Sequence, residues 1–406
     1  MDGRRFTGKR RLLGCFALLL AMAACGPKST ENMPTFADPD TAYVPTTGTG
    51  NAFDVYAQVA IAVEQNPADP QKQGQLTEFA QKKLLVTFAP ELKEIADATK
   101  LTCDFKFRTR DPFIPAPFVS GWRALGRLYV WKVEQAVKAN DLATAVETVC
   151  VATKFGFDLM GGGGVEADLG ATIVDGVRQA ILPAWPRLTP PQLWTLSQRV
   201  KRASFGHDSP SELLKRERQN VQVALQYVLE RSAEGKLTEL YQNTGADHEV
   251  IDHLKKIQGN ASKRTEFFRG LAAEEAERFR FVNELDTDRT QPNPEFDKNR
   301  MWRRLSRLLF SGYRPLRDRV ETTLARTRLL VISCVLERQL RTSKPLPKTL
   351  DGVSSPTRID PFSGDKFGFS QDGTSYNVYS IGKDGVDNGG ESDPTHTAPD
   401  LRLEPY

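Results

Sequence analysis

The sequence predicts a mainly α-helical protein, an irregular stack of antiparallel helical hairpins with a small C-terminal β-hairpin module. From about residue 51 to about residue 342, apolar residues recur at the three- and four-residue spacing of amphipathic helices. Beyond residue 342, segments of alternating polarity flank an Asp-Gly pair, a common turn of tight hairpins. These patterns divide the chain into a signal segment at 1–24, a tether at 25–50, a helical domain at 51–321 and a C-terminal module at 322–406.

The first 24 residues have the pattern of an export signal and are not part of the folded body. Five basic residues precede an apolar stretch, Leu12 to Ala24, that is too short to span a bilayer comfortably. The signal runs into Met-Ala-Ala-Cys, which resembles the lipobox of bacterial lipoproteins. The resemblance implies that Cys25 is acylated and becomes the first residue of a membrane-anchored protein. An ordinary secretory signal cut near Ala24, or an uncleaved anchor, is the alternative.

The residues after Cys25 bear on where such an anchor would lie. Two or three acyl chains would hold the protein permanently, because each buried methylene contributes about 0.8 kcal/mol. Gly26 follows the cysteine in place of the aspartate that resembles an inner-membrane retention signal. By that analogy we expect the outer membrane, facing the periplasm. Residues 26–50 lack periodic apolar positions and are expected to form a disordered tether.

The export signal also accounts for the apparent basicity of the chain. The whole chain has 55 Lys and Arg against 51 Asp and Glu, and residues 1–24 hold five of the basic residues and one acid. The remainder therefore has 50 of each, which gives a nucleic-acid role no electrostatic support. Cys103, Cys150 and Cys334 are too widely spaced for a disulfide framework or a zinc cluster. Cys103 and Cys150 either pair in an oxidising envelope or remain free thiols.

Capping residues and prolines set the first helix boundaries. A helix that begins at Asn51 is expected to stop at Pro67. The following apolar stretch forms two helices, or one helix that is kinked at Pro90. The segment 101–118 is rich in proline and is expected to be irregular.

The clearest unit is a helical hairpin at 121–160, broken at Asn140-Asp141. Its turn resembles those of tetratricopeptide-type repeats. No second copy follows at the repeat length of about 34 residues, so a regular solenoid is not expected. Thr189 caps another helix, and long charged helices follow at 209–235 and 261–285.

Two motifs invite a catalytic interpretation that their spacing does not support. Gly161–Gly164 fits neither G-x-G-x-x-G nor a P-loop, and is expected to end one helix and begin the next. His248 and His253 are five residues apart, about 140° around a helix, whereas zinc protease helices need about 40°. We therefore expect a surface helix there. No G-x-S-x-G hydrolase motif occurs in the chain.

The segment 300–319 holds seven arginines against one acid. Trp302, Leu305, Leu308 and Leu309 fall on one face of a helix there. Such a helix either lies on an anionic lipid surface or packs on neighbouring helices, with its arginines solvated or paired.

The C-terminal module carries the most specific pattern. A helix from about residue 322 leads through a Pro-containing loop to Asp360-Pro361, and a hairpin is expected across Asp372-Gly373. Tyr-Ser-x-Gly-x-Asp-Gly and a Gly-Gly-Glu tail follow. This order, over about 322–393, resembles the C-terminal half of type II secretion major pseudopilins. The module also resembles segments of uncharacterised helical envelope proteins.

The pseudopilin resemblance implies a calcium-binding loop. By position, Ser380, Asp384, Asp387 and Asp393 would be the oxygen donors, with Glu391 and backbone carbonyls as further candidates. The spacing is not that of an EF-hand, since Val386 stands at the third ligand position, and the loop is one residue longer than in pseudopilins. Calcium is the only cofactor expected, and a flexible acidic surface turn is the alternative.

Together these features predict a lipid-anchored envelope protein with no enzymatic activity, which acts as a scaffold or in protein interactions. Its expected partners are the membrane, through the anchor, and other envelope proteins. Two alternatives remain: an accessory component of a secretion or pilus system, or a hydrolase or binding protein with a site in the helical body. A substantial pocket that collects acids or histidines would favour the last.

Overall fold

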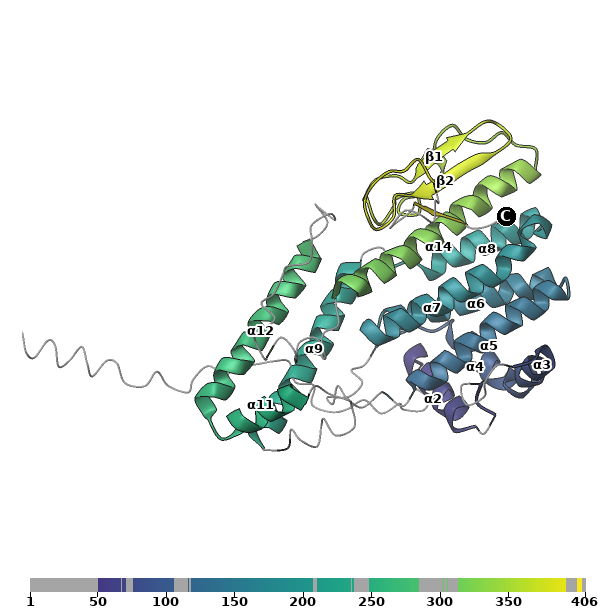
Figure 1. Cartoon of the computed structure of the whole chain (residues 1–406). Helices are drawn as coiled ribbons and strands as arrows, with labels where there is room; N and C mark the ends of the chain where they lie inside the picture. Colours follow the sequence, from purple (N-terminus) through teal and green to yellow (C-terminus); the bar gives the residue numbers. More distant parts are fainter. Residues whose placement is uncertain are drawn as a thin grey trace, which may run out of the picture.

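The computed structural model describes residues 50–66, 68–70, 76–105, 116, 118–206, 210–234, 236, 248–284, 302, 305, 313–391 and 400–403. The export signal, the lipobox with Cys25, nearly all of the tether and Asp393 lie outside the described residues. The described chain is mainly α-helical and carries a small antiparallel sheet of three strands, as predicted (Figure 1). None of its described helices is long and apolar enough to cross a bilayer.

The helices follow one another along the chain, and the three strands all lie near its C-terminus. The α-helices are α2 (Ala52–Gln65), α3 (Glu78–Thr87), α4 (Ala89–Ala98), α5 (Val119–Lys138), α6 (Leu142–Met160), α7 (Gly164–Ile181), α8 (Pro190–Ala203), α9 (Pro210–Ala233), α11 (His248–Gln258), α12 (Ala261–Glu284) and α14 (Tyr313–Arg341). Short 3-10 helices occupy Leu182–Arg187 and Leu350–Gly352. The strands are β1 (Gly368–Gln371), β2 (Tyr376–Ser380) and β3 (Leu401–Arg402).

Side-chain caps form where the sequence predicted helix starts. The Asn51 side chain accepts a hydrogen bond from the Phe53 N–H at 3.1 Å, and Asp141 accepts one from the Thr144 N–H at 3.0 Å. Each cap satisfies one of the N–H groups that a helix leaves unpaired in its first turn. The expected breaks before α2 and α6 are thereby confirmed. α3 and α4 are two separate helices that meet at Phe88.

The helices α2 to α8 enclose the first hydrophobic core. Three of its large aromatic residues bury their rings and still pair their polar atoms. Trp122 Nε1 donates to the Tyr56 carbonyl at 2.9 Å, and the Tyr129 hydroxyl donates to the Leu92 carbonyl at 2.9 Å. The Tyr56 hydroxyl donates to Asp158 at 2.8 Å. Because each buried donor has an acceptor, the rings contribute their apolar area without an unsatisfied polar group.

The helices α9, α11 and α12 form a second core, which α7 and α14 complete. Leu305 is fully buried in it, and the Trp302 ring packs edge-on against Phe267 at 6.4 Å between centroids. The described apolar positions of the basic segment 300–319 thus pack on neighbouring helices rather than face outward. Leu308 and Leu309 lie outside the described residues.

A third core lies between α14 and the sheet (Figure 1). β1 pairs with β2 in antiparallel register, with Gly368 opposite Tyr379 and Gln371 opposite Tyr376. The predicted hairpin across Asp372-Gly373 is confirmed. The short strand β3 was not predicted, and it pairs with the other edge of β2.

The cysteines in the described residues are free thiols, so Cys103 and Cys150 do not pair. Burial raises the pKa of the Cys150 thiol to about 12 and raises the pKa of Cys103 as well. These thiols therefore stay protonated at neutral pH and behave as small apolar groups.

One close contact between helices gives a test of the packing of α2 on α5. A Cβ added to Gly121 would overlap the backbone carbonyl of Ala60, and no flexible side chain lies there to give way. We expect Gly121→Ala to lower the free energy of unfolding by about 3 kcal/mol, the upper end of typical overpacking costs. Urea unfolding measures it. Gly259→Ala is the control, because nothing lies within 4 Å of the added Cβ. Equal stabilities of the two variants would contradict the contact.

Candidate functional site

A cavity of about 730 Å³ opens where α5, α7, α9 and α14 meet. This volume is within the range of about 300–1,000 Å³ that is typical of small-molecule sites. We call it the α5–α7 pocket. Its lining residues are Arg123, Gly126, Arg127, Val130, Gly164, Val165, Asp168, Leu169, Thr172, Ile173, Gly176, Glu217, Val221, Tyr313, Pro315, Leu316 and Arg319.

The pocket residues of α5 and α7 recur every three or four positions, so each set lies on one face of its helix. Glycines bring the two faces together. A Cβ on Gly126 would lie 2.6 Å from Ile173 Cγ1, and one on Gly176 would lie 2.9 Å from Val130 Cγ2. Glycine inside a helix costs about 1 kcal/mol relative to alanine. Glycines inside predicted helices were therefore the sequence signal that could have pointed to this contact.

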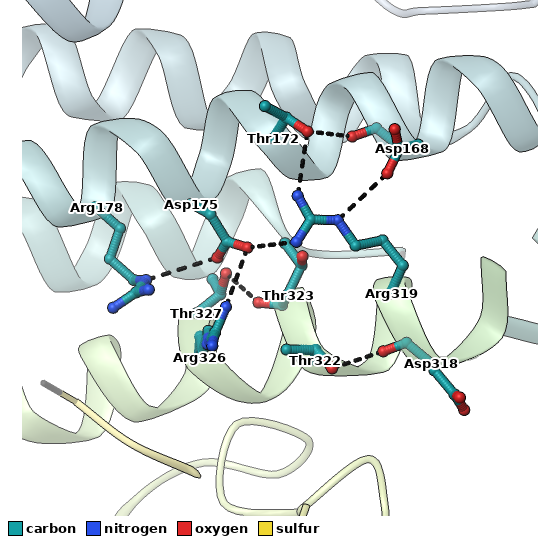
Figure 2. Close-up of polar contacts among 10 residues, drawn as sticks. All are labelled: Asp168, Thr172, Asp175, Arg178, Asp318, Arg319, Thr322, Thr323, Arg326 and Thr327. Atoms are coloured by element: carbon teal, nitrogen blue, oxygen red, sulfur yellow. Dashed lines mark hydrogen bonds and ion pairs between the residues drawn. The ribbon is translucent and has the colours of Figure 1, made fainter. Parts of the chain in front are cut away.

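A buried carboxylate fixes the α14 wall of the pocket (Figure 2). Asp175 on α7 is 7% exposed and faces three arginines. Its Oδ2 lies 3.1 Å from Arg319 Nη1 and 3.3 Å from Arg326 Nη1, both on α14. Its Oδ1 lies 3.7 Å from Arg178 Nε on its own helix. A buried charge is tolerated where opposite charges surround it, so this network locks α14 onto α7.

Arg319 makes two further contacts on α7. Its Nη2 donates to Thr172 Oγ1 at 3.1 Å, and its Nε lies 3.5 Å from Asp168 Oδ1 (Figure 2). The planar guanidinium thus spans two turns of the neighbouring helix, which suits its fixed fork of donors. Arg319 is thus shared between two carboxylates, Asp168 and Asp175.

Glu217 fixes the α9 wall. Its Oε2 accepts a hydrogen bond from the Gly164 N–H at 2.6 Å, at the N-terminus of α7. A helix N-terminus carries partial positive charge and unpaired N–H groups, so a carboxylate is stabilised there. The predicted role of Gly161–Gly164 is confirmed, since α6 ends at Met160 and α7 begins at Gly164. An internal carboxylate, rather than a phosphate, occupies this helix start.

Tyr313 belongs to a buried pair at the pocket edge. Its hydroxyl donates to Glu275 Oε1 at 2.8 Å, and Arg218 Nε lies 3.1 Å from the same oxygen. Burial raises the pKa of Tyr313, and the Glu275 charge raises it further. The hydroxyl therefore remains a protonated donor and positions α14 on α12.

Two arginines in the pocket have no carboxylate partner among the described residues. Arg123 and Arg127 are exposed and lie one turn apart on α5. Arg127 Nη1 donates to the Pro70 carbonyl at 3.3 Å. Within the described part of the chain, no carboxylate lies at ion-pair distance from either guanidinium. The pocket therefore carries positive charge that no described carboxylate neutralises.

The loop predicted to bind calcium is built around a residue that sequence reasoning missed. Asp360 is 1% exposed, and its carboxylate accepts from Ser380 Oγ at 2.9 Å, the Ile381 N–H at 3.0 Å and the Phe362 N–H at 3.0 Å. The Ser380 hydroxyl is therefore turned toward Asp360. Asp360 ties the Asp-Pro turn to the start of the loop.

The predicted acids do not all converge. Asp387 accepts from the Tyr379 hydroxyl at 3.0 Å and the Gly389 N–H at 2.9 Å, while Asp384 accepts from the Val386 N–H at 3.2 Å. Glu391 is exposed at the end of the loop, and Asp393 lies outside the described residues. In the residues that the structure describes, no three Asp, Glu, His or Cys side chains gather closely enough to hold a metal.

Asp400 is a second residue that sequence reasoning missed. Its Oδ2 accepts from the N–H groups of Asn388 at 3.1 Å and Gly390 at 2.7 Å. Its Oδ1 is buried without a hydrogen-bond partner. Burial raises the pKa of Asp400, and the charges of Asp387 and Asp384 raise it further. Negative charge is therefore concentrated on this side of the loop.

Two other motifs have structural roles. Ser363-Gly-Asp-Lys366 has the S-x-x-K spacing of some serine hydrolases. Lys366 Nζ, however, lies 2.6 Å from Asp351 Oδ1 on the exposed surface, so the lysine is held as a charged partner of that acid. His253 on α11 packs against the Phe267 ring at 5.7 Å, and burial lowers its pKa.

The Asp175 network gives a test of how α14 is held. We expect Asp175→Asn to lower the free energy of unfolding by about 2–3 kcal/mol, because the three arginines lose their shared counter-charge. Chemical denaturation measures the change. Asp97→Asn is the matched control, since this exposed acid pairs with Lys93 and Lys100, and surface pairs contribute about 1 kcal/mol or less. The role of the network would be refuted if Asp175→Asn lowered the free energy of unfolding no more than Asp97→Asn does.

No family model, curated protein or solved structure matched the chain when it was compared with each. The pseudopilin resemblance of residues 322–393 thus rests on the motifs quoted above. Function follows from the chemistry of the α5–α7 pocket and the C-terminal loop.

Proposed function

We propose that this chain is a lipid-anchored protein of the bacterial cell envelope that binds a partner without catalysing a reaction. Acylated Cys25 would anchor it to the outer membrane, with the folded body facing the periplasm. The α5–α7 pocket would be the binding site.

The observation that carries this proposal is how the pocket uses its acids. Glu217 accepts the Gly164 N–H, and Asp168 lies 3.5 Å from Arg319 although its side chain is 71% exposed, so each carboxylate has a partner in the fold. A general base needs a carboxylate or imidazole that is available to the substrate. The charged groups of the pocket that have no carboxylate partner in the described chain are the guanidinium groups of Arg123 and Arg127, whose N–H donors favour anions.

The arrangement of consecutive helices supports an interaction role for the body as a whole. α5 packs on α6 across the turn at Asn140, and α6 packs on α7 across the glycine turn. We interpret this as the irregular stack of helical hairpins expected from the sequence. Such stacks offer extended surfaces to partners. The helix–turn–hairpin order of the C-terminal module fits the pseudopilin-like unit that we propose there.

Photo-crosslinking in intact envelopes tests the binding site. A photoreactive amino acid would replace Val165, which lines the pocket and is 43% exposed. We expect a discrete adduct at this position in the acylated protein. The control places the same amino acid at Phe79 on α3, which is 80% exposed and lies away from the pocket residues. An adduct of equal yield at both positions, or none at Val165, would overturn the proposal.

A structural calcium ion in the C-terminal loop is a second proposal, which the buried, unbonded oxygen of Asp400 favours. Asp384, Asp387 and Asp400, which do not gather closely in the described structure, would have to draw together to supply carboxylate oxygens, and Glu391 and Asp393 would extend the set. Calcium favours such hard oxygen donors and would neutralise their mutual repulsion. Its role would be to hold the loop in shape.

Thermal melting of the full chain with EDTA and with Ca²⁺ tests the ion. At a concentration near 100 Kd, calcium should raise the free energy of unfolding by about 2.7 kcal/mol. Asp387→Asn should abolish this gain. Asp365→Asn is the control, because Asp365 is exposed and lies in the turn before β1, outside the loop. Identical melting curves with EDTA and Ca²⁺ would rule the site out.

A further inference from the structure

We propose that the α5–α7 pocket binds a single-chain amphiphile with an anionic head group, such as a long-chain carboxylate. This inference rests on the proposed binding function and adds the chemical class of the ligand. It follows from the apolar groups that line the pocket and from the charged groups there that have no ion-pair partner.

The inner wall of the pocket is aliphatic. Val130 on α5, Leu169 and Ile173 on α7 and Leu316 on α14 all line it. Three of the four are buried or nearly so, with exposed fractions of 7%, 2% and 9% for Leu169, Ile173 and Leu316. The apolar area that a bound hydrocarbon would take out of water belongs mainly to Val130, which is partly exposed, and to Val165, which is 43% exposed. This wall therefore suits a hydrocarbon body.

The charge balance of the pocket selects the head group. Arg178 and Arg326 balance Asp175 together with Arg319, Asp168 pairs with Arg319, and the Gly164 N–H stabilises Glu217. Arg123 and Arg127 then remain as positive charge at the mouth, and they belong to the same α5 face as Val130. Two guanidinium groups one turn apart can donate several charge-assisted hydrogen bonds to one carboxylate. A cationic head group would be repelled there.

The anion-binding groups and part of the aliphatic surface lie on the same face of α5. Along α5 the order is Arg123, Arg127 and then Val130, so charge gives way to aliphatic surface within two turns. A ligand with its anion on the arginines would direct its chain toward Ile173 and Leu316. A free small anion lacks the hydrocarbon chain, and a neutral alcohol of the same chain length lacks the negative charge for the arginines.

Isothermal titration calorimetry on the unacylated chain from residue 26 onward, which keeps every described residue, tests this inference. The probes are dodecanoate, dodecan-1-ol, dodecyltrimethylammonium and acetate. We expect dodecanoate to bind at least about tenfold more tightly than dodecan-1-ol, as one charge-assisted hydrogen bond would give. The cationic probe should bind more weakly than the alcohol, and acetate should not bind.

Variants locate the ligand. Arg123→Gln with Arg127→Gln should abolish the advantage of dodecanoate over the alcohol. Because Arg127→Gln also removes the hydrogen bond to the Pro70 carbonyl, the melting temperature of the double variant checks its fold. Lys83→Gln with Arg202→Gln is the control, which removes two exposed positive charges outside the pocket. Val165→Trp should weaken both probes by narrowing the pocket.

The outcomes separate this inference from the proposed function. Equal affinity for dodecanoate in the α5 double variant and the native chain would overturn the ligand class. Absence of dodecanoate binding together with a Val165 crosslink would do the same, and would leave the binding function standing. Absence of both would overturn the pocket as a binding site.

Discussion

The burial of α14 on all sides is the constraint on which the rest of the structure depends. This helix contributes Leu330 to the core of α2–α8, Leu324 to the core around α9–α12 and Leu329 to the core beneath the sheet. A surface helix needs one apolar stripe, whereas a helix enclosed by three cores needs apolar side chains around most of its circumference. The uninterrupted run at 329–332 meets that requirement, because Leu330 and Val331 belong to the core of α2–α8, whereas Leu329 and Ile332 belong to the core beneath the sheet.

Several arginines of α14 are paired. Arg317 pairs with Glu321 at 3.0 Å within the helix, and Arg328 donates to the Ile359 carbonyl at 2.8 Å in the loop before the sheet. Arg319 and Arg326 reach Asp175 across the contact with α7. Since a buried charge without a partner is costly, these pairs fix the rotation of α14 about its axis. That rotation brings Leu316 to the wall of the pocket.

Local patterns were enough to predict the helical body and the hairpin. The caps at Asn51 and Asp141, and the Asp372-Gly373 turn, act within a few residues and can be identified in a sequence. The pocket depends on contacts such as that of Arg319 with Asp175, which are 144 residues apart. Asp360 and Asp400 escaped prediction for the same reason, because a lone aspartate in a loop gives no sign of the distant N–H groups it will accept. β3 is only two residues long and shows no alternation.

The contact of α14 with α7 and α8 has a consequence for how the chain is made. Arg341 near the end of α14 donates to the Trp185 carbonyl at 3.0 Å, a residue synthesised 156 positions earlier. Helices α7 and α8 are therefore synthesised with the face that packs on α14 uncovered, and it stays uncovered until α14 follows. Exposed apolar faces of this kind make partly folded chains prone to aggregate. A chaperone that holds the nascent chain would be most needed during that interval.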